Sequence, residues 1–431
     1  MIRITEEANK ILKNTTWLIG CRIIQALLSF VIGILSARYL GPSNYGVIDY
    51  AGAITSFMVP VVQLGIRSTL VHEIISDPTN EGRTVGTSLL MSVMASSLGI
   101  VGVAAFVSIA NKGESETIIV CVLYSVSLVF QASEMMQYWF QAKLLSKYVA
   151  VISLVSYIGV SAYRCFLLIA QKSVYWFALS QALDCFFISV GLFIAYRKQG
   201  GKKLSFSLDK AKSIFRRSKY YIVSGIMVTL FSLTDRVMIT LMLGKEANGY
   251  YSAAVTCADM SRFVFAAIID SVRPSILEAK KVGSKNYYKN ISRLYSITIY
   301  LALIQCIAFM IGASVVVKII YGDAYIEAIS TLRIITWYTA FAHMGTVRNI
   351  WILAEQKQHL LWKINLSGAL LNIVVNSLLI PIIGINGAAI SSVLSQFFVN
   401  FVLCIIIKPL KTAGKLMIDG INPFNLRKLW S

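Results

Sequence analysis

The stretch FSLTDRVMITLMLGKEANGYY, residues 231–251, places an acid and a base inside an apolar run. Asp235 and Arg236 stand about two helical turns before that run ends at Leu243. A charge at this depth of a hydrocarbon-length helix is costly unless it faces a partner or a wet cavity. The pair therefore predicts a functional site inside a membrane.

The end of this stretch has a second copy earlier in the chain. Gly41 and Gly46 close an apolar run, and Gly244 and Gly249 repeat the same spacing 203 positions later. A further shared signature, an arginine after the next apolar run, recurs 206 positions apart. Two related halves are typical of transporters. We expect the four glycines to form a structural loop motif.

Composition places the chain in a membrane. Hydrophobic residues make up 57% of the 431 residues and charged residues only 14%, against roughly 25% charged in soluble domains. The net charge of +20 is explained by an excess of Lys and Arg in cytoplasmic loops. Aromatic and basic residues are not interleaved as they are in proteins that bind single-stranded nucleic acid, so the sequence does not indicate a nucleic-acid partner. The seven cysteines lack CxxC spacing, so we expect small core residues rather than disulfides or a metal site.

Runs of about 20 residues with little or no charge predict twelve transmembrane helices. Six runs precede a basic segment and six follow it. We therefore expect an N-lobe at 1–196, a cytoplasmic linker at 197–218, a C-lobe at 219–407 and a cytoplasmic tail at 408–431. The runs lie at 15–37, 45–66, 84–108, 117–140, 149–170, 174–196, 219–243, 250–272, 294–318, 329–354, 361–381 and 386–407.

The basic residues also predict the orientation. With the N-terminus inside, the inner segments hold 29 Lys and Arg and the outer loops hold 5, which places both termini in the cytoplasm. Within the linker, Ser207 can cap a helix in which Leu, Ile and Phe stand among basic residues. This pattern is typical of a helix on the anionic inner leaflet. A solvated basic loop is the alternative.

Polar residues at helical spacing predict that several spans line an aqueous cavity. Arg22 and Gln25 share one face of the first run, and Gln131 and Glu134 share one face of the fourth. We expect Gln25 and Gln131 to bind substrate beside the arginines. Small and polar residues at this spacing also mediate plain helix packing, which is the alternative for most of these positions.

The arginines inside the apolar runs suggest the chemistry of the substrate. Arginine forms bidentate, charge-assisted bonds to phosphate oxygens and keeps its proton, so such a cavity would suit a phosphate or diphosphate. Four acids at similar depth are candidates for ion coupling or charge pairing, and structural ion pairing is the alternative to a binding site. The arginines are Arg22, Arg164, Arg236, Arg262 and Arg348, and the acids are Glu134, Asp184, Asp235 and Asp259.

The sequence offers no support for an enzyme. Each predicted extramembrane segment is too short for a folded catalytic domain. The chain contains no GxxxxGK[ST], HExxH or GxSxG motif, which are signatures of nucleotide and hydrolytic sites. We therefore expect a transporter with no catalytic residue, cofactor or metal, driven by a gradient or by downstream consumption of its substrate.

Four segments of the chain resemble one family. They are ARYLGPSNYG at 37–46, TDR at 234–236 with LGKEANGYY at 243–251, RPS at 273–275 and PIIGINGAA at 381–389. Together they are similar to the Wzx-type flippases of O-antigen or capsule repeat units, in the multidrug/oligosaccharidyl-lipid/polysaccharide (MOP) superfamily. The resemblance implies an all-α, MATE-like fold of twelve transmembrane helices in two pseudo-symmetric lobes. Asp235 matches the acid of the family's seventh-helix motif, and the four glycines match its outer loop motif.

The resemblance also implies an activity. Such proteins move an undecaprenyl-diphosphate-linked oligosaccharide from the inner to the outer leaflet of the bacterial inner membrane by alternating access. It implies coupling to an ion gradient, with H⁺ or Na⁺ left open, and a glycan polymerase and a chain-length regulator as partners. A drug or small-solute exporter of the same superfamily is the main alternative, although Arg22 stands where such exporters are expected to carry acids. A membrane glycan polymerase or ligase is the other alternative. Such enzymes are expected to carry their catalytic residues on a large outside loop, whereas the outside loops predicted here are short.

Overall fold

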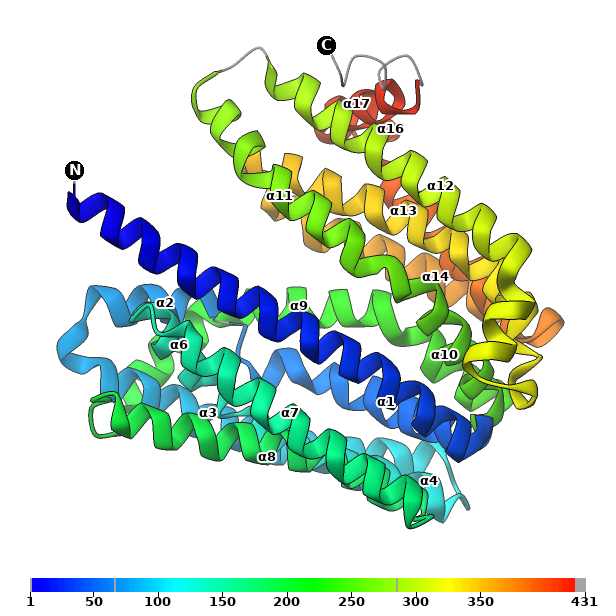
Figure 1. Cartoon of the computed structure of the whole chain (residues 1–431), viewed down its shortest axis with the longest axis horizontal. Helices are drawn as coiled ribbons and strands as arrows, with labels where there is room; N and C mark the ends of the chain where they lie inside the picture. The colour runs from blue at the N-terminus through cyan, green and yellow to red at the C-terminus, as the bar shows by residue number, and fades with distance from the viewer. Residues whose placement is uncertain (1, 66, 284–285, 423–431) are drawn as a thin grey trace. The chain divides into compact units, whose positions relative to one another are not determined.

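The computed structural model describes residues 2–65, 67–283 and 286–422, and within those ranges it contains helices and loops but no strand (Figure 1). Ten helices in these ranges are long and apolar enough to cross a membrane. The backbone of a lipid-embedded segment must satisfy its own hydrogen bonds, which an α-helix does within a single segment. The expected all-α, multi-pass membrane fold is therefore confirmed.

The chain divides into two compact units. Unit 1 consists of the residues up to Leu40 and Val47–Ile226, and unit 2 consists of Gly41–Gly46 and the residues from Met227. The division falls on either side of Gly41–Gly46, inside α1 (Ile2–Val62), and again inside α9 (Leu208–Leu243). The lobe, linker and tail limits expected from the sequence stay a prediction.

Unit 1 contains most of α1 and the first part of α9. Its helices are α1 (Ile2–Val62), α2 (Arg67–Ser76), α3 (Glu81–Ala110), α4 (Ser115–Ser125), α5 (Ser127–Gln131), α6 (Glu134–Ala142), α7 (Ser146–Ile169) and α8 (Val174–Lys198), with a short 3-10 helix η1 (Pro78–Asn80). Within the unit, α7 and α8 lie side by side. Its apolar core includes Trp139 and Tyr196, whose rings pack edge to face with their centroids 4.8 Å apart.

Unit 2 contains the rest of α9, and its α12 and α13 lie side by side (Figure 1). Its core includes Tyr295 and Trp351. Its α-helices are α10 (Lys245–Ala258), α11 (Arg262–Lys281), α12 (Asn286–Ile320), α13 (Ala328–Ala354), α14 (Leu361–Ile383), α15 (Ile385–Phe397), α16 (Leu403–Ile406) and α17 (Lys411–Ile421). Its shorter elements are the 3-10 helices η2 (Asp259–Ser261), η3 (Asp323–Tyr325), η4 (Gln358–Leu360) and η6 (Lys408–Leu410) and the π-helix η5 (Phe398–Val402).

The helices follow the apolar runs seen in the sequence. The first run and most of the second lie in α1, which breaks at Gly41, where φ is 70° and ψ is 173°, and ends at Val62. The tenth run forms α13, a helix of 27 residues that carries Arg333, His343 and Arg348 and is not one of the ten helices found long and apolar enough to cross a membrane. The number of twelve spans in two six-helix lobes stays a prediction.

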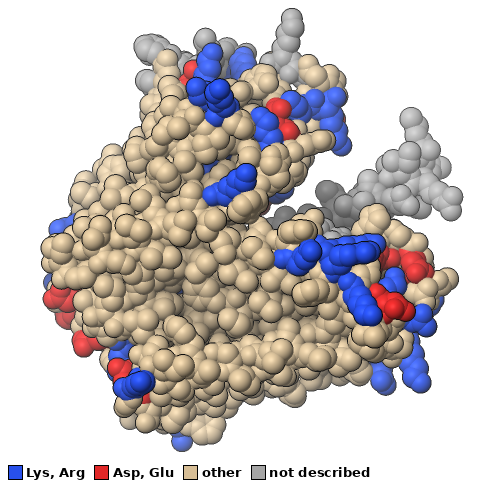
Figure 2. Space-filling view, turned by 180° about the vertical axis from the view of Figure 1, so that it is seen from behind, with Lys and Arg blue, Asp and Glu red and all other residues tan. Residues whose placement is uncertain are grey.

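The surface of the molecule suits a lipid environment. Large apolar side chains stay exposed along the helices, for example Leu98 at 73% and Ile311 at 77%. On the face drawn in Figure 2, Lys, Arg, Asp and Glu gather in separate clusters, and the surface between those clusters carries few charges. All seven cysteines are free, and all but Cys165 are buried, so those six are core residues as expected.

The basic linker consists of a loop and the start of a helix. The loop runs along the start of α3, where the Ser205 amide donates to the Gly82 carbonyl at 3.4 Å and the Ser207 amide donates to Thr87 Oγ1 at 3.0 Å. Helix α9 then begins at Leu208 and continues to Leu243. The helix expected inside the linker is therefore the first part of a much longer helix, and its place at a membrane surface stays a prediction.

Candidate functional site

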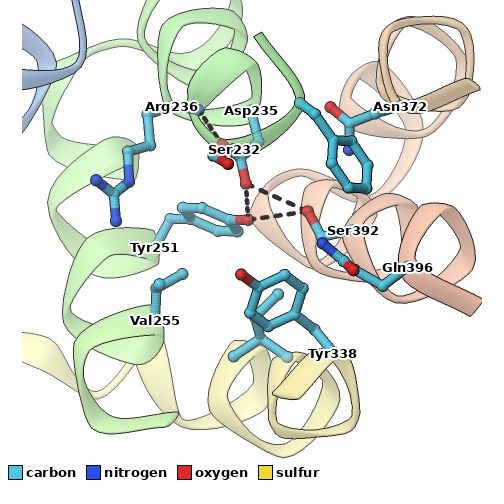
Figure 3. A pocket seen from close by; sticks show the side chains of 11 residues that line it. Ser232, Asp235, Arg236, Tyr251, Val255, Tyr338, Asn372, Ser392 and Gln396 are labelled. Atoms are coloured by element: carbon cyan, nitrogen blue, oxygen red, sulfur yellow. Dashed lines mark hydrogen bonds between the residues drawn. The ribbon is translucent and has the colours of Figure 1, made fainter. Parts of the chain in front are cut away.

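A small polar cavity of about 30 Å³ lies in unit 2, with side chains from α9, α10, α13, α14 and α15 around it (Figure 3). This volume is enough for about one or two water molecules. Asp235, the acid that stood out in the sequence, is one of its walls. The lining residues are Phe231, Ser232, Asp235, Arg236, Tyr251, Val255, Ile335, Tyr338, Asn372, Ser392 and Gln396.

The Asp235 carboxylate accepts hydrogen bonds from three donors. Tyr251 donates its hydroxyl to Oδ2, and Ser392 donates its hydroxyl to the same oxygen at 3.2 Å. The backbone amide of Arg236 donates to Oδ1 at 2.9 Å. Hydrogen bonds to a charged acceptor are among the strongest in proteins, so this arrangement can hold a negative charge inside the membrane. In Figure 3 the Arg236 guanidinium points away from this carboxylate.

The repeated glycines set the geometry of the α9–α10 junction. Gly41 and Gly244 both have positive φ, 70° and 93°, with ψ values of 173° and 171°, a conformation that only glycine adopts readily. Gly46 has no room for a Cβ, because that atom would overlap the Lys245 carbonyl oxygen. A Cβ on Gly249 would likewise overlap the backbone of Pro42. The two copies of the motif therefore pack backbone to backbone.

A second cavity of about 180 Å³ adjoins the first, because the two share Phe231, Ser232, Tyr338 and Gln396 as walls. Three of the predicted charged residues, Asp259, Arg262 and Arg348, line it, together with several amide side chains. The Arg262 side chain is 73% exposed, and its Nη1 lies 3.9 Å from Asp259 Oδ2. Unit 2 thus brings together five of the predicted charged residues around two adjoining cavities.

Arg348 is the most deeply buried of these arginines, with 3% of its surface exposed. Its Nη1 donates to the Val399 carbonyl at 2.9 Å and its Nη2 donates to Asn349 Oδ1 at 3.1 Å. Val399 lies in the π-helix η5, an element that occurs frequently at functional sites. Among the described residues, no carboxylate lies within ion-pair distance of this guanidinium.

The predicted site residues of unit 1 make local polar contacts. Arg164 Nε donates to Ser180 Oγ at 2.8 Å, and Asp184 Oδ1 accepts from Ser156 Oγ at 2.8 Å. Glu134 accepts from the Gln63 amide at 2.7 Å, and Gln131 lies 3.9 Å from the sulfur of Cys185. On α1, Arg22 is exposed and Gln25 is half-buried. In these four contacts the partner is an uncharged side chain.

The sequence reasoning missed the partners of Asp235. Tyr251 lies in the same stretch, 231–251, and follows Asp235 by 16 positions. Its place on the next helix is a signal from which the contact could have been predicted. Ser392 follows by 157 positions, and no spacing in the sequence connects it to Asp235. The Asp235 carboxylate can take up a proton. Its oxygens, with those of Tyr251, Ser392 and the amide side chains in the cavity wall, can also surround a small hard cation.

Comparison with known proteins gives one family and one fold. A model of the family described as polysaccharide biosynthesis protein matches residues 11–280. The capsular polysaccharide biosynthesis protein CapF of Staphylococcus aureus is 22% identical over 396 residues, which cover 89% of this chain and 96% of that protein.

Two solved structures share the arrangement of helices. The lipid II flippase MurJ in an inward closed conformation matches with a TM-score of 0.73 at 12% identity, over 96% of this chain and 92% of MurJ. An inward-facing multidrug resistance transporter of the MATE family matches with a TM-score of 0.67 at 14% identity, over 94% of this chain and 96% of that one. The expected MATE-like fold is confirmed.

Proposed function

The chain belongs to the polysaccharide biosynthesis protein family, and from that premise we propose that it flips an undecaprenyl-diphosphate-linked oligosaccharide from the inner to the outer leaflet of a bacterial inner membrane. One observation carries the proposal: Arg236, Arg262 and Arg348 line two adjoining polar cavities inside a membrane-spanning unit. A diphosphate is the part of such a substrate that these guanidinium groups would bind.

Arg348 is the strongest single contribution to anion binding. A buried charge without an opposite charge is costly, and this guanidinium has only neutral acceptors among the described residues. A diphosphate oxygen would supply the missing negative charge. Amide groups of Asn349, Asn365 and Gln396 line the same cavity and would hydrogen-bond to sugar hydroxyls. The polyprenyl tail would remain in lipid.

Transport by alternating access requires that the anion bind more weakly in the outward state, because a ligand shifts an equilibrium only through its differential affinity. Asp235 would supply that difference. Its donors Tyr251 and Ser392 and the neighbouring Arg236 can each change partner when the carboxylate gains a proton or meets a cation. Coupling to H⁺ or Na⁺ would act here, with Asp259, Glu134 and Asp184 as further candidates.

Within unit 1, the further candidates for substrate contacts are Arg22, Arg164, Gln25 and Gln131. We also propose that both termini lie in the cytoplasm, because an excess of Lys and Arg is typical of cytoplasmic segments. The product would pass to a glycan polymerase and a chain-length regulator on the outer side.

Replacement of Arg236 tests the proposal. In a strain that lacks its own flippase, we expect Arg236→Ala to abolish surface glycan, and Arg236→Lys to restore part of it, because lysine keeps the charge but loses the bidentate geometry. Arg333→Ala is the matched control, since Arg333 is an exposed arginine of unit 2 outside both cavities. Wild-type glycan from both Arg236 variants, at equal protein levels, would remove Arg236 from the mechanism.

An exporter of drugs or small solutes is the second candidate, supported by the fold shared with the multidrug transporter. Purified protein in liposomes separates the two. A flippase moves a lipid-linked oligosaccharide across the bilayer and leaves a cationic dye in place. An exporter moves the dye and leaves the lipid-linked oligosaccharide in place.

A further inference from the structure

The first turns of α9 carry an exposed face of mixed basic and apolar side chains, which the proposed transport does not use. We call it the α9 basic face and define it as Leu208, Lys212, Phe215, Arg216, Lys219 and Tyr220. Leu208 is 58% exposed, Phe215 56% and Tyr220 72%, and the three basic side chains are exposed as well. Spacings of three and four residues place most of this set on one side of the helix.

The opposite side of the same turns is fixed to unit 1. Ile214 and Ser218 are buried, and Ile214 packs in the apolar core of the unit. Arg217 Nη1 lies 2.7 Å from Glu73 Oε1. Just before the helix, Lys202 Nζ donates to the carbonyl oxygens of Pro78 and Thr79 at 2.9 and 3.2 Å. These contacts hold the helix in place and leave the α9 basic face outward.

The basic residues of this face have no acidic partner in the described part of the chain. No carboxylate there lies within ion-pair distance of Lys212, Arg216 or Lys219, in contrast to the paired Arg217. Asp209 is the one acid of these first turns and stands in the first turn of α9, where it complements the helix dipole. The face therefore presents three positive charges to an external anion.

The length of α9 leaves this face outside the hydrocarbon core. The helix has 36 residues, which corresponds to about 54 Å, whereas about 20 residues cross the hydrocarbon core. Lys219 is followed by no charged residue until Asp235, so the membrane-spanning part is the C-terminal part. About 16 residues, from Leu208 onward, are left outside the hydrocarbon core, and the α9 basic face lies among them.

We propose that the α9 basic face is a binding surface for anionic phospholipid headgroups. Lys212, Arg216 and Lys219 contact the phosphates, and Leu208, Phe215 and Tyr220 enter the boundary between headgroups and acyl chains. Basic side chains interspersed with aromatic and aliphatic ones suit a lipid surface. The proposal does not depend on which substrate the protein moves.

Photo-crosslinking to defined lipids tests it. The full chain is placed in phosphatidylcholine nanodiscs that contain the same fraction of photoactivatable phosphatidylglycerol or photoactivatable phosphatidylcholine, and adducts are mapped by mass spectrometry. We expect several-fold more phosphatidylglycerol than phosphatidylcholine adducts in residues 203–223. The triple variant Lys212→Gln/Arg216→Gln/Lys219→Gln should lose this preference, by up to about fivefold for each side chain, the equivalent of about 1 kcal/mol each.

The matched control is Lys112→Gln/Lys172→Gln/Lys318→Gln, which removes the same charge from exposed lysines elsewhere and should keep the preference. Equal adducts of the two lipids in this segment of the wild-type protein would overturn the proposal. So would an undiminished preference in the triple variant. The wild-type comparison decides by itself if the variant fails to fold.

Discussion

At the scale of single residues, the hydroxyl of Tyr251 donates a hydrogen bond directly to the Asp235 carboxylate. Tyr251→Phe removes this donor from a side chain that is 1% exposed, and a buried hydrogen bond to a charged group contributes about 1.5–3 kcal/mol. We expect a folded protein with at least a tenfold loss of flipping in proteoliposomes. Tyr250→Phe is the neighbouring control, because that hydroxyl donates to Glu246 on an exposed part of α10. Equal activity of the two variants would contradict the role given to Tyr251.

The glycines of the repeated motif lead to a prediction about stability. Gly249→Ala would force a Cβ into the backbone of Pro42, and overpacking of this kind costs about 1–3 kcal/mol or more. We expect the variant to lose its monodisperse peak on heating well before the wild type in fluorescence-detected size-exclusion chromatography. Gly33→Ala is the control, since a Cβ there meets open space and alanine favours a helix. The same thermal stability in both variants would show that the close approach is absent.

Part of the candidate site was predictable from the residues, for a physical reason. A charge inside an apolar run is visible without a structure, and this is how Asp235, Arg236 and Arg348 were identified. What could not be predicted is which neutral groups meet them. Ser392 reaches Asp235 through packing between α9 and α15, and no periodicity along the chain encodes that approach.

At the scale of helices, the apolar runs predicted the elements well, because a lipid-embedded segment has few alternatives to a helix. The continuity of α9 was not predictable, because the Glu73 ion pair and the apolar core around Ile214 join the expected linker helix to the seventh apolar run. The π-helix η5 was also missed. Its extra residue depends on local packing, which leaves no pattern in the sequence.

The π-helix gives a prediction about Arg348. Its guanidinium donates to Val399 in η5 and to Asn349 at the same time, and the single ammonium group of lysine does not reproduce that planar fork. We expect Arg348→Lys to lower flipping about tenfold, for a loss of about 1.4 kcal/mol of binding, with the fold intact. Arg333→Lys, a change at an exposed position of the same helix, should have no effect. Full activity of Arg348→Lys in proteoliposomes would mean that charge alone suffices.

At the scale of the whole molecule, α9 connects the lipid-facing surface with the candidate site. Leu208 in the α9 basic face and Asp235 in the cavity stand 27 positions apart on one unbroken helix, which belongs to unit 1 up to Ile226 and to unit 2 from Met227. A helix that two sites share can couple them when it has two arrangements. Anionic lipid that binds the first turns of α9 should therefore bias the arrangement of the cavity residues.

Transport assays in liposomes of graded composition test this coupling. We expect the rate of flipping to rise several-fold as phosphatidylglycerol replaces part of the phosphatidylcholine, and the rise to shrink at high salt, because exposed charges are screened. Lys212→Gln/Arg216→Gln/Lys219→Gln should keep the rate seen in pure phosphatidylcholine and lose the increase, whereas Lys112→Gln/Lys172→Gln/Lys318→Gln should respond as the wild type does. If the first variant still responds fully, lipid acts elsewhere on the protein. If it is inactive in every lipid, these side chains serve transport itself rather than its adjustment by the membrane.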